Sequence, residues 1–459
     1  MTRRWGLIVI VILLIPVAVH AVWDQVESTL LARDIARLAQ QGEPVDAAAT
    51  SWLATAEQRR SARLYAAAAG LARWQTQGDG FAMTAKDVEL PGSDPRLEEA
   101  RLQAYLAEAE PALQLAGLAA SLDFAGFSSI DPQLQTNQSG LGTLSGMSNL
   151  KADILSVRGE ASLASEELVR AVILQRTITI PYYRYGSVGR LYGSLRILLK
   201  HASPDADSLR RLQAALETWP DDDGVVADLR RERARRLGMF WPYPTNGVSW
   251  ARRPQQGYRA GIGEAIGFVA ARPALTHAVR SGLQPYADAI AVAREPWPAK
   301  LDSTRALARR YGVEPGAALN TSLLNAFRHS DSFGVQKLTL TLPVAGMNLA
   351  FRRTAIATIA AERFRRAHAG QPPASLEALV PEFLAAVPQD PFDGKPLKYR
   401  LMPDSYAVYS VDINRVDDNG ALHGFGTGIG GRVRPIRDDP SPRDIGIRVP
   451  LTPVRQGLD

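Results

Sequence analysis

Residues 203–220 read SPDADSLRRLQAALETWP, and this stretch carries the pattern that decides the fold class. Its large apolar side chains recur at spacings of three and four residues, which places them on one face of an amphipathic helix: Leu209, Leu212, Leu216 and Trp219. Ser203 can cap such a helix, Pro204 suits its first position, and Pro220 follows its end. The stretch therefore predicts a helix with one buried face.

Similar patterns extend in both directions along the chain. Val188, Leu191, Leu195 and Leu198 form a second stripe, and further helical runs cover residues 24–41, 46–74, 96–122, 151–174, 224–238, 260–293, 299–311 and 345–369. Ala, Leu and Arg recur throughout, and this mixture favours helix. With 46% hydrophobic residues over 459 positions, the chain has enough apolar material for two or three domains. No fixed repeat period is evident, so we expect an irregular all-α domain rather than a solenoid.

Three stretches interrupt the helical pattern. Residues 124–149 are rich in Ser, Gly and Asn and predict a long loop. Residues 336–342, QKLTLTL, alternate polar residues with Leu and predict a strand. Residues 239–258 combine Pro, Gly and aromatic side chains, which either line a groove for a peptide or glycan or cover the helical core.

Charge and cysteine content exclude several classes of function. The formal net charge of +6 is too small, over so long a chain, to indicate nucleic-acid binding, and no RNA- or DNA-binding signature accompanies it. Cysteine is absent, which excludes disulfides, Cys-ligated zinc and thiol nucleophiles. We therefore expect no nucleic-acid partner.

Residues 5–23, WGLIVIVILLIPVAVHAVW, form an apolar stretch near the N-terminus. At about 1.5 Å per residue a helix of this length spans roughly 28 Å, close to the hydrocarbon core of a bilayer. Arg3 and Arg4 precede it and Asp24 follows, so the positive-inside rule places the N-terminus in the cytoplasm. We expect a single-pass protein of the inner (cytoplasmic) membrane, with its bulk in the periplasm.

A cleaved signal peptide is the alternative for the same residues. Val19-His20-Ala21 offers small residues at the positions that a signal peptidase requires. Both interpretations place residues 24 onward outside the cytoplasm.

The C-terminal region has an ordered series of elements. A helix carries Leu349, Ile356, Ala360, Phe364 and Ala367 on one face and stops at Gly370. A short second helix follows, and residues 388–399, PQDPFDGKPLKY, then form a turn at Asp393-Gly394 that leads into alternating strands. In the second strand, Tyr406, Val408 and Ser410 lie on one side and Ala407, Tyr409 and Val411 on the other.

This order resembles the globular region of type II secretion major pseudopilins of the G class. The likeness covers residues 346–420, and reaches 451 if 444–447 close the sheet. It departs from that family in two ways. Residues 7–11 lack the glutamate that pseudopilins carry in the membrane helix, and about three hundred residues separate that helix from the module. We therefore expect a module shared with pseudopilins rather than a pilus subunit.

The resemblance implies a calcium site in the loop after the second strand. Asn414, Asp417 and Asp418 fall in the matching loop, and Asp444 can join them. Calcium requires several oxygen ligands, which clustered Asp and Asn supply. The alternative is an ordinary Asx-rich turn between strands.

Other motifs give no catalytic constellation. None of the six histidines has a metal-ligand partner at suitable spacing, and each is expected at the surface or as a cap. The Gly-rich residues 424–431 lack the context of a phosphate-binding loop. The charged residues 228–236 either face anionic headgroups or form a solvated helix face with internal ion pairs.

We therefore expect a mainly α protein in four segments: a cytoplasmic stub and transmembrane signal-anchor (1–23), a helical periplasmic domain (24–340), a pseudopilin-like α+β module (341–431), and an Arg-, Pro- and Asp-rich tail (432–459) that can add a last strand. The expected function is an envelope interaction or scaffold protein, accessory to a secretion or pilus-like assembly, with protein partners in the envelope. The alternative is a periplasmic hydrolase or glycan-processing enzyme, which needs two carboxylates roughly 5–10 Å apart. Glu98, Glu264 and Glu362 are its candidates.

Overall fold

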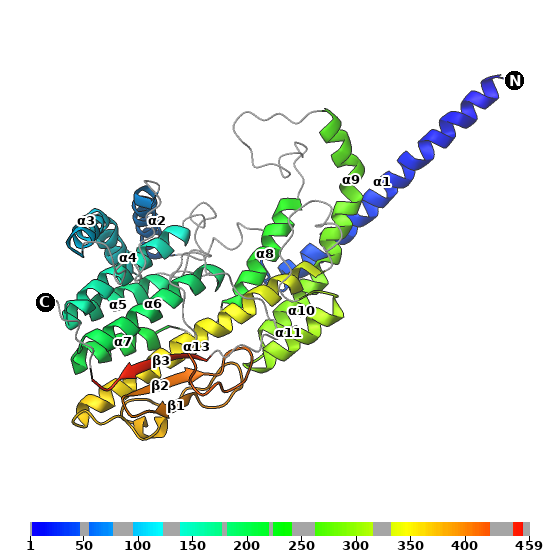
Figure 1. Cartoon of the computed structure of the whole chain (residues 1–459). Coiled ribbons are helices and arrows are strands. Elements are labelled where there is room, and N and C mark those ends of the chain that lie inside the picture. Colours follow the sequence, from blue (N-terminus) through cyan, green and yellow to red (C-terminus); the bar gives the residue numbers. More distant parts are fainter. Residues whose placement is uncertain are drawn as a thin grey trace. The chain divides into compact units, whose positions relative to one another are not determined.

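The computed structural model describes residues 2–45, 55–76, 95–122, 138–176, 181–219, 224–240, 262–314, 332–422 and 444–452. At several helix ends, including residues 2–13 and 262–268, it describes the backbone alone. Helices dominate these residues and one three-stranded sheet accompanies them, which confirms the prediction of a mainly α protein (Figure 1).

The chain forms two compact units. Unit 1 contains Met1–Thr50, Leu229–Arg294 and Thr304–Leu338, and unit 2 contains Ser51–Asp228, Glu295–Ser303 and Thr339–Asp459. The units are interleaved along the sequence, so the segment 24–340 contributes to both.

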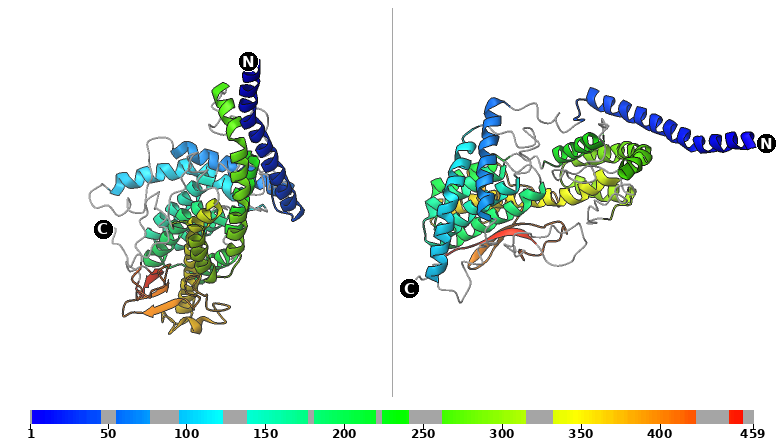
Figure 2. Two further views of the ribbon diagram at one scale, coloured as in Figure 1. Left: turned by 90° about the vertical axis from the view of Figure 1, so that its right-hand side faces the viewer. Right: turned by 90° about the horizontal axis from the view of Figure 1, so that it is seen from above.

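In unit 1, a long helix α1 (Thr2–Gln40) lies beside α9 (Ile262–Ser281), as the views in Figures 1 and 2 agree. The two helical runs that we expected at residues 5–23 and 24–41 are therefore one continuous helix. The run expected at 260–293 is divided at Gly282 into α9 and α10 (Leu283–Ala293). Most of α8 (Val225–Phe240) and α11 (Ala299–Arg310) also belongs to this unit.

The helical part of unit 2 contains α2 to α7, with these bounds: α2 (Ala56–Thr76), α3 (Pro95–Ala120), α4 (Gln138–Val157), α5 (Ala161–Arg176), α6 (Pro181–His201) and α7 (Ala206–Glu217). The core between α2, α3 and α4 is built largely from alanine, with Tyr65, Leu113 and Leu144 filling the larger spaces. Small side chains let the helix backbones approach closely, so this core needs few large residues.

The C-terminal part of unit 2 packs a small sheet against the helix α13 (Phe333–Ala367). After a 3-10 turn η4 (Leu376–Leu379) come β1 (Lys398–Leu401), β2 (Ser405–Ser410) and β3 (Ile445–Pro450). The sheet is antiparallel in the order β1-β2-β3, with Val408 opposite both Tyr399 and Ile447. Every residue of β2 is buried, so both faces of this central strand are covered. The expected series of elements is confirmed, including the last strand.

Three further predictions about secondary structure were wrong. The single run expected at 151–174 is divided between α4 and α5 by a turn at Arg158 and Gly159. Residues 336–342 belong to the helix α13, not to a strand. Leu338 and Leu342 are four residues apart and both are fully buried, so the alternation hides a helical face. Residues 138–149, expected as loop, are part of α4, because Leu144 and Met147 are buried against neighbouring helices. Burial there outweighs the low helix propensity of Ser, Gly and Asn.

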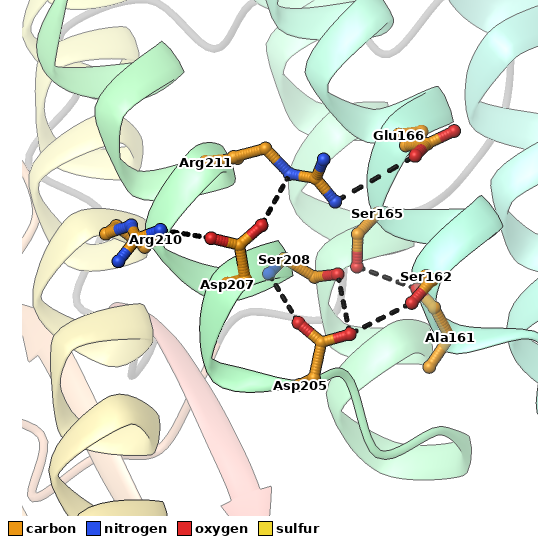
Figure 3. A network of polar contacts seen from close by, with 9 residues as sticks. All are labelled: Ala161, Ser162, Ser165, Glu166, Asp205, Asp207, Ser208, Arg210 and Arg211. Carbon is orange, nitrogen blue, oxygen red and sulfur yellow. Dashed lines mark hydrogen bonds and ion pairs between the residues drawn. The ribbon is translucent and has the colours of Figure 1, made fainter.

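The start of α7 also differs from expectation. The N-cap is Asp205 rather than Ser203, and its carboxylate accepts a hydrogen bond from the Ser208 N–H at 2.7 Å. The same carboxylate accepts a bond of 3.0 Å from the Ser162 hydroxyl of α5 (Figure 3). Arg211 joins the two helices again, lying 3.8 Å from Glu166 and 3.5 Å from Asp207. The cap is thus also a contact between helices.

No helix in the described part of the chain is both long and apolar enough to cross a membrane. Several sequence expectations fall outside the described residues: the loop part 124–137, most of the aromatic stretch 239–258, and the Gly-rich residues 424–431.

Candidate functional site

The acidic loop that follows β2 is a compact turn held by its own polar atoms. Its backbone takes positive φ at Asp412 (57°), Arg415 (57°), Asn419 (59°) and Gly420 (73°). Asp and Asn tolerate this left-handed conformation better than most residues, and Gly adopts it freely. The Arg415 guanidinium lies 3.0 Å from the carboxylate of Asp302, which ties the loop to the segment Glu295–Ser303 of the same unit.

Asp444 closes the loop from the start of β3. Its side chain is fully buried and accepts hydrogen bonds from the N–H groups of Gly420 at 2.7 Å and Asp418 at 3.4 Å. Burial raises the pKa of Asp444 to about 6, and the carboxylates of Asp418 and Asp417 add to the increase, although the two N–H donors oppose it. The structure therefore brings three of the expected calcium ligands close enough to interact.

The other oxygens of the loop have partners within the protein. Asp417 accepts hydrogen bonds from the Tyr409 hydroxyl and the Asn419 N–H, both at 3.0 Å. Asn414 donates its amide to Asp418 at 3.3 Å and accepts the Val416 N–H at 3.1 Å. These bonds are the ones expected of an Asx-rich turn.

The residues fit a hard cation by chemistry, because three carboxylates and one amide carbonyl supply only oxygen. A cation would also offset the repulsion from Asp418 and Asp417, which adds to the effect of burial on the pKa of Asp444. In the present geometry, however, no three acidic or histidine side chains among the described residues are arranged to hold a metal ion. Calcium binding stays a prediction.

The turn that precedes β1 is built on a buried carboxylate. Asp390 accepts the N–H groups of Phe392 and Val411, each at 2.8 Å, which joins this turn to the end of β2. Burial raises the pKa of Asp390 despite these bonds. The role of Asp390 in this geometry is to hold two segments of the module together.

Of the three carboxylates named for a hydrolase, the structure describes only the side chain of Glu362, so this alternative stays a prediction. Glu362 is buried, accepts the Tyr406 hydroxyl at 2.7 Å and pairs with Arg365 at 2.8 Å, so it stabilises the packing of α13 on β2. A small cavity of about 20 Å³ between α5, α6, α7 and α13 is lined by apolar side chains and Arg352, with no Asp or Glu. The side chains of Glu98 and Glu264 lie outside the described residues.

Sequence reasoning missed the contribution of the segment Glu295–Ser303 to this module. Trp297 packs so closely on α13 that a Cβ on Gly346 would lie 3.0 Å from its ring, and 3.1 Å from Phe392. Pro298 lies similarly close to Gly394. The one signal in the sequence was a Trp between two prolines, at 296–298.

A second candidate region is the apolar surface of α1. Seven of the fourteen large apolar side chains that are exposed in the described part of the chain lie within residues 14–26: Leu14, Ile15, Val17, Val19, Val22, Trp23 and Val26. Such a concentration differs from the scattered exposure of single apolar side chains that is normal for soluble proteins.

Ion pairs with α9 begin near the C-terminal end of this surface. Asp24 lies 3.1 Å from Arg272, and Glu27 lies 2.9 Å from Arg280 and 3.0 Å from His277. Burial acts to raise the pKa of Glu27, but Arg280 and His277 together lower it. The second half of α1 is therefore fixed to α9 by charged contacts.

The charged helix α8 forms several ion pairs, of which the pair between Glu232 and Arg235 is internal to the helix as expected, whereas Glu43 lies after α1 and outside α8. Glu43 lies 2.6 Å from Arg230 and 2.7 Å from Arg233, and Glu232 lies 2.6 Å from Arg235. Arg233 is buried, however, so this face is not fully solvated.

Comparison with known proteins gives no relative. No family model, no curated protein and no solved structure matches this chain. The function must therefore be argued from the chain's own residues.

Proposed function

We propose that this chain is a membrane-anchored envelope protein that acts as an interaction or scaffold protein. The observation that carries the proposal is the division of α1 into two halves. Residues 5–23 contain no Asp, Glu, Lys or Arg, and their described large apolar side chains are exposed, whereas charged contacts to α9 begin at Asp24.

The free energy of burying these side chains favours a lipid environment. Each fully buried Val, Leu or Ile contributes roughly 1.5–3 kcal/mol relative to water, so a dozen of them favour insertion strongly. Arg3 and Arg4 lie before the apolar stretch, and they orient the N-terminus toward the cytoplasm. Residues 24 onward then lie on the other side of the membrane.

Membrane fractionation with protease protection and N-terminal sequencing tests this topology. We expect a membrane-bound chain that starts at Met1 or Thr2 and is digested from the outside of spheroplasts. A soluble chain that starts at Val22 would instead identify the segment as a cleaved signal peptide.

The α+β part of unit 2, residues 341–452, is proposed as the part that binds a protein partner. Its order of elements supports the resemblance to pseudopilins, and it exposes apolar side chains on both β1 and the acidic loop. Leu401 and Val416 are each more than half exposed. Because these side chains pack against little in the chain, substitutions there should leave the fold intact.

Affinity purification of the full-length protein from detergent-solubilised envelopes tests the partner proposal. We expect components of a pseudopilus-type machine to co-purify, and the double variant L401S/V416S to lose them. The matched control is L163S, which changes an equally exposed leucine on α5 of the same unit. Equal recovery with both variants would contradict the role of this module.

A further inference from the structure

Helices α1 and α9 run in the same direction with a fixed register. The His20 ring lies 3.1 Å from the carbonyl oxygen of Ala270, Asp24 pairs with Arg272, and Glu27 pairs with Arg280. Residues further along α1 therefore contact residues further along α9. The position of α1 in a membrane consequently sets the position of α9.

The boundary between apolar and charged residues falls at the same level on both helices. On α1 the first charge after the apolar stretch is Asp24, and on α9 its partner Arg272 ends a run of ten residues, 262–271. That run reads IGEAIGFVAA and contains a single charge, Glu264. Its last described side chains face solvent, with Val269 59% exposed.

We propose that residues 262–271 of α9 lie in the lipid interface beside α1, so that unit 1 contacts the membrane through two helices. The inference rests on the proposed membrane anchor and adds a second lipid-binding element to it. From Ala270 back to Ile262 the helix extends roughly 12 Å along its axis. Because α9 runs beside α1, this length takes residues 262–271 from the headgroups into the nearer half of the hydrocarbon core, which is about 15 Å thick.

The charge of unit 1 supports lipid, rather than a protein, as the partner of residues 262–271. Its segments carry 20 Lys and Arg against 10 Asp and Glu, a formal charge of +10, whereas unit 2 carries 33 against 37, a formal charge of −4. Without Arg3 and Arg4, which precede the anchor, unit 1 still carries +8. Basic residues next to a membrane span are attracted to anionic headgroups.

The absence of cysteine from the chain makes a direct test straightforward. Three single-cysteine variants of the full-length protein are labelled with an environment-sensitive nitrobenzoxadiazole dye and reconstituted into vesicles of phosphatidylcholine and phosphatidylglycerol. V269C tests α9, V19C tests the anchor, and A291C, at an exposed alanine of α10 in the same unit, is the control. Vesicles with and without doxyl-labelled lipid are compared.

We expect doxyl lipid to quench the dye at positions 269 and 19 but not at position 291. Quenching at 19 without quenching at 269 would overturn the role of α9 and leave the anchor intact. Failure to quench at all three positions would overturn the proposed anchor as well. A blue-shifted but unquenched dye at 269 would identify a protein surface, not lipid, as the occupant.

Discussion

The carboxylate of Asp444 accepts a hydrogen bond of 2.7 Å from the backbone N–H of Gly420. This bond joins the residue before β3 to the end of the loop that follows β2, and Asp444 is fully buried where it forms. The carboxylates of Asp417 and Asp418 lie near enough to influence its ionisation. Asp444 thus both holds the start of β3 against the acidic loop and interacts with the other carboxylates of the candidate calcium site.

The stability of unit 2 should depend on pH through Asp444. Because its folded pKa is raised from 3.8 to about 6, the folded state binds this proton more tightly than the unfolded state does. The contribution of Asp444 to the free energy of unfolding therefore falls as pH rises from about 4 to about 6, by at most roughly 3 kcal/mol. Urea unfolding at pH 4.5 and 7.5 should show a smaller pH difference for D444N than for the natural chain. The same pH difference in both proteins would contradict this assignment.

Calcium should stabilise the same unit at neutral pH if the acidic loop binds it. A ligand that binds only the folded state adds about 2.7 kcal/mol at a concentration one hundred times its Kd, so the Tm should rise with calcium. Magnesium should have a smaller effect, because it requires stricter octahedral geometry. We expect D417N to lose the response and D404N, at an exposed aspartate between β1 and β2, to keep it. A Tm that is unchanged by millimolar calcium would leave the loop as an Asx-rich turn.

Local patterns predicted the elements whose apolar spacing fits only one structure. The stripe from Leu209 to Leu216 is buried in α7. The closing strand at 444–447, which the resemblance suggested, corresponds to β3. The alternation in 336–342 wrongly predicted a strand, because the spacing of Leu338 and Leu342 fits one face of a strand and one face of a helix equally well. Only contacts with distant segments distinguish the two.

The candidate site was predicted in part for a similar reason. The loop residues Asp417 and Asp418 are close in sequence, and the resemblance supplied Asp444 from 26 residues away. The packing of Trp297 on Gly346 depends on a pair of segments with no shared pattern, so the sequence offered no spacing to detect it. Likewise, the buried Ser and Asn residues of α4 show their role only after neighbouring helices cover them.

Replacing Gly346 with alanine should test the packing of the segment Glu295–Ser303 on α13. The new methyl group would lie 3.0–3.1 Å from the rings of Trp297 and Phe392, and such overpacking typically costs about 1–3 kcal/mol. The matched control is G117A in α3 of the same unit, where a Cβ meets nothing within 4 Å. That change should stabilise by roughly 0.5–1 kcal/mol, because alanine favours helix. Equal unfolding free energies for the two variants would show that the Trp297 contact is absent or easily moved.

The cap of α7 predicts both how a substitution of Asp205 changes the stability of unit 2 and how that change depends on pH. Asp205 accepts the Ser208 N–H and the Ser162 hydroxyl, and these bonds, led by the Ser208 N–H, hold the pKa of Asp205 below its ordinary value of 3.8 (Figure 3). D205A should therefore destabilise unit 2 by about 1 kcal/mol at neutral pH, since it removes the cap and the contact with α5. A lowered folded pKa means that this contribution is complete above the ordinary pKa and is lost as pH falls below about 4.

D207A is the control, because Asp207 forms only solvent-exposed ion pairs with Arg210 and Arg211, worth less than about 1 kcal/mol. Chemical denaturation at pH 7 and pH 3 should thus separate the two variants at pH 7 more than at pH 3. If D207A lowered the free energy of unfolding more than D205A, the surface ion pairs rather than the cap would be the main contact between these helices.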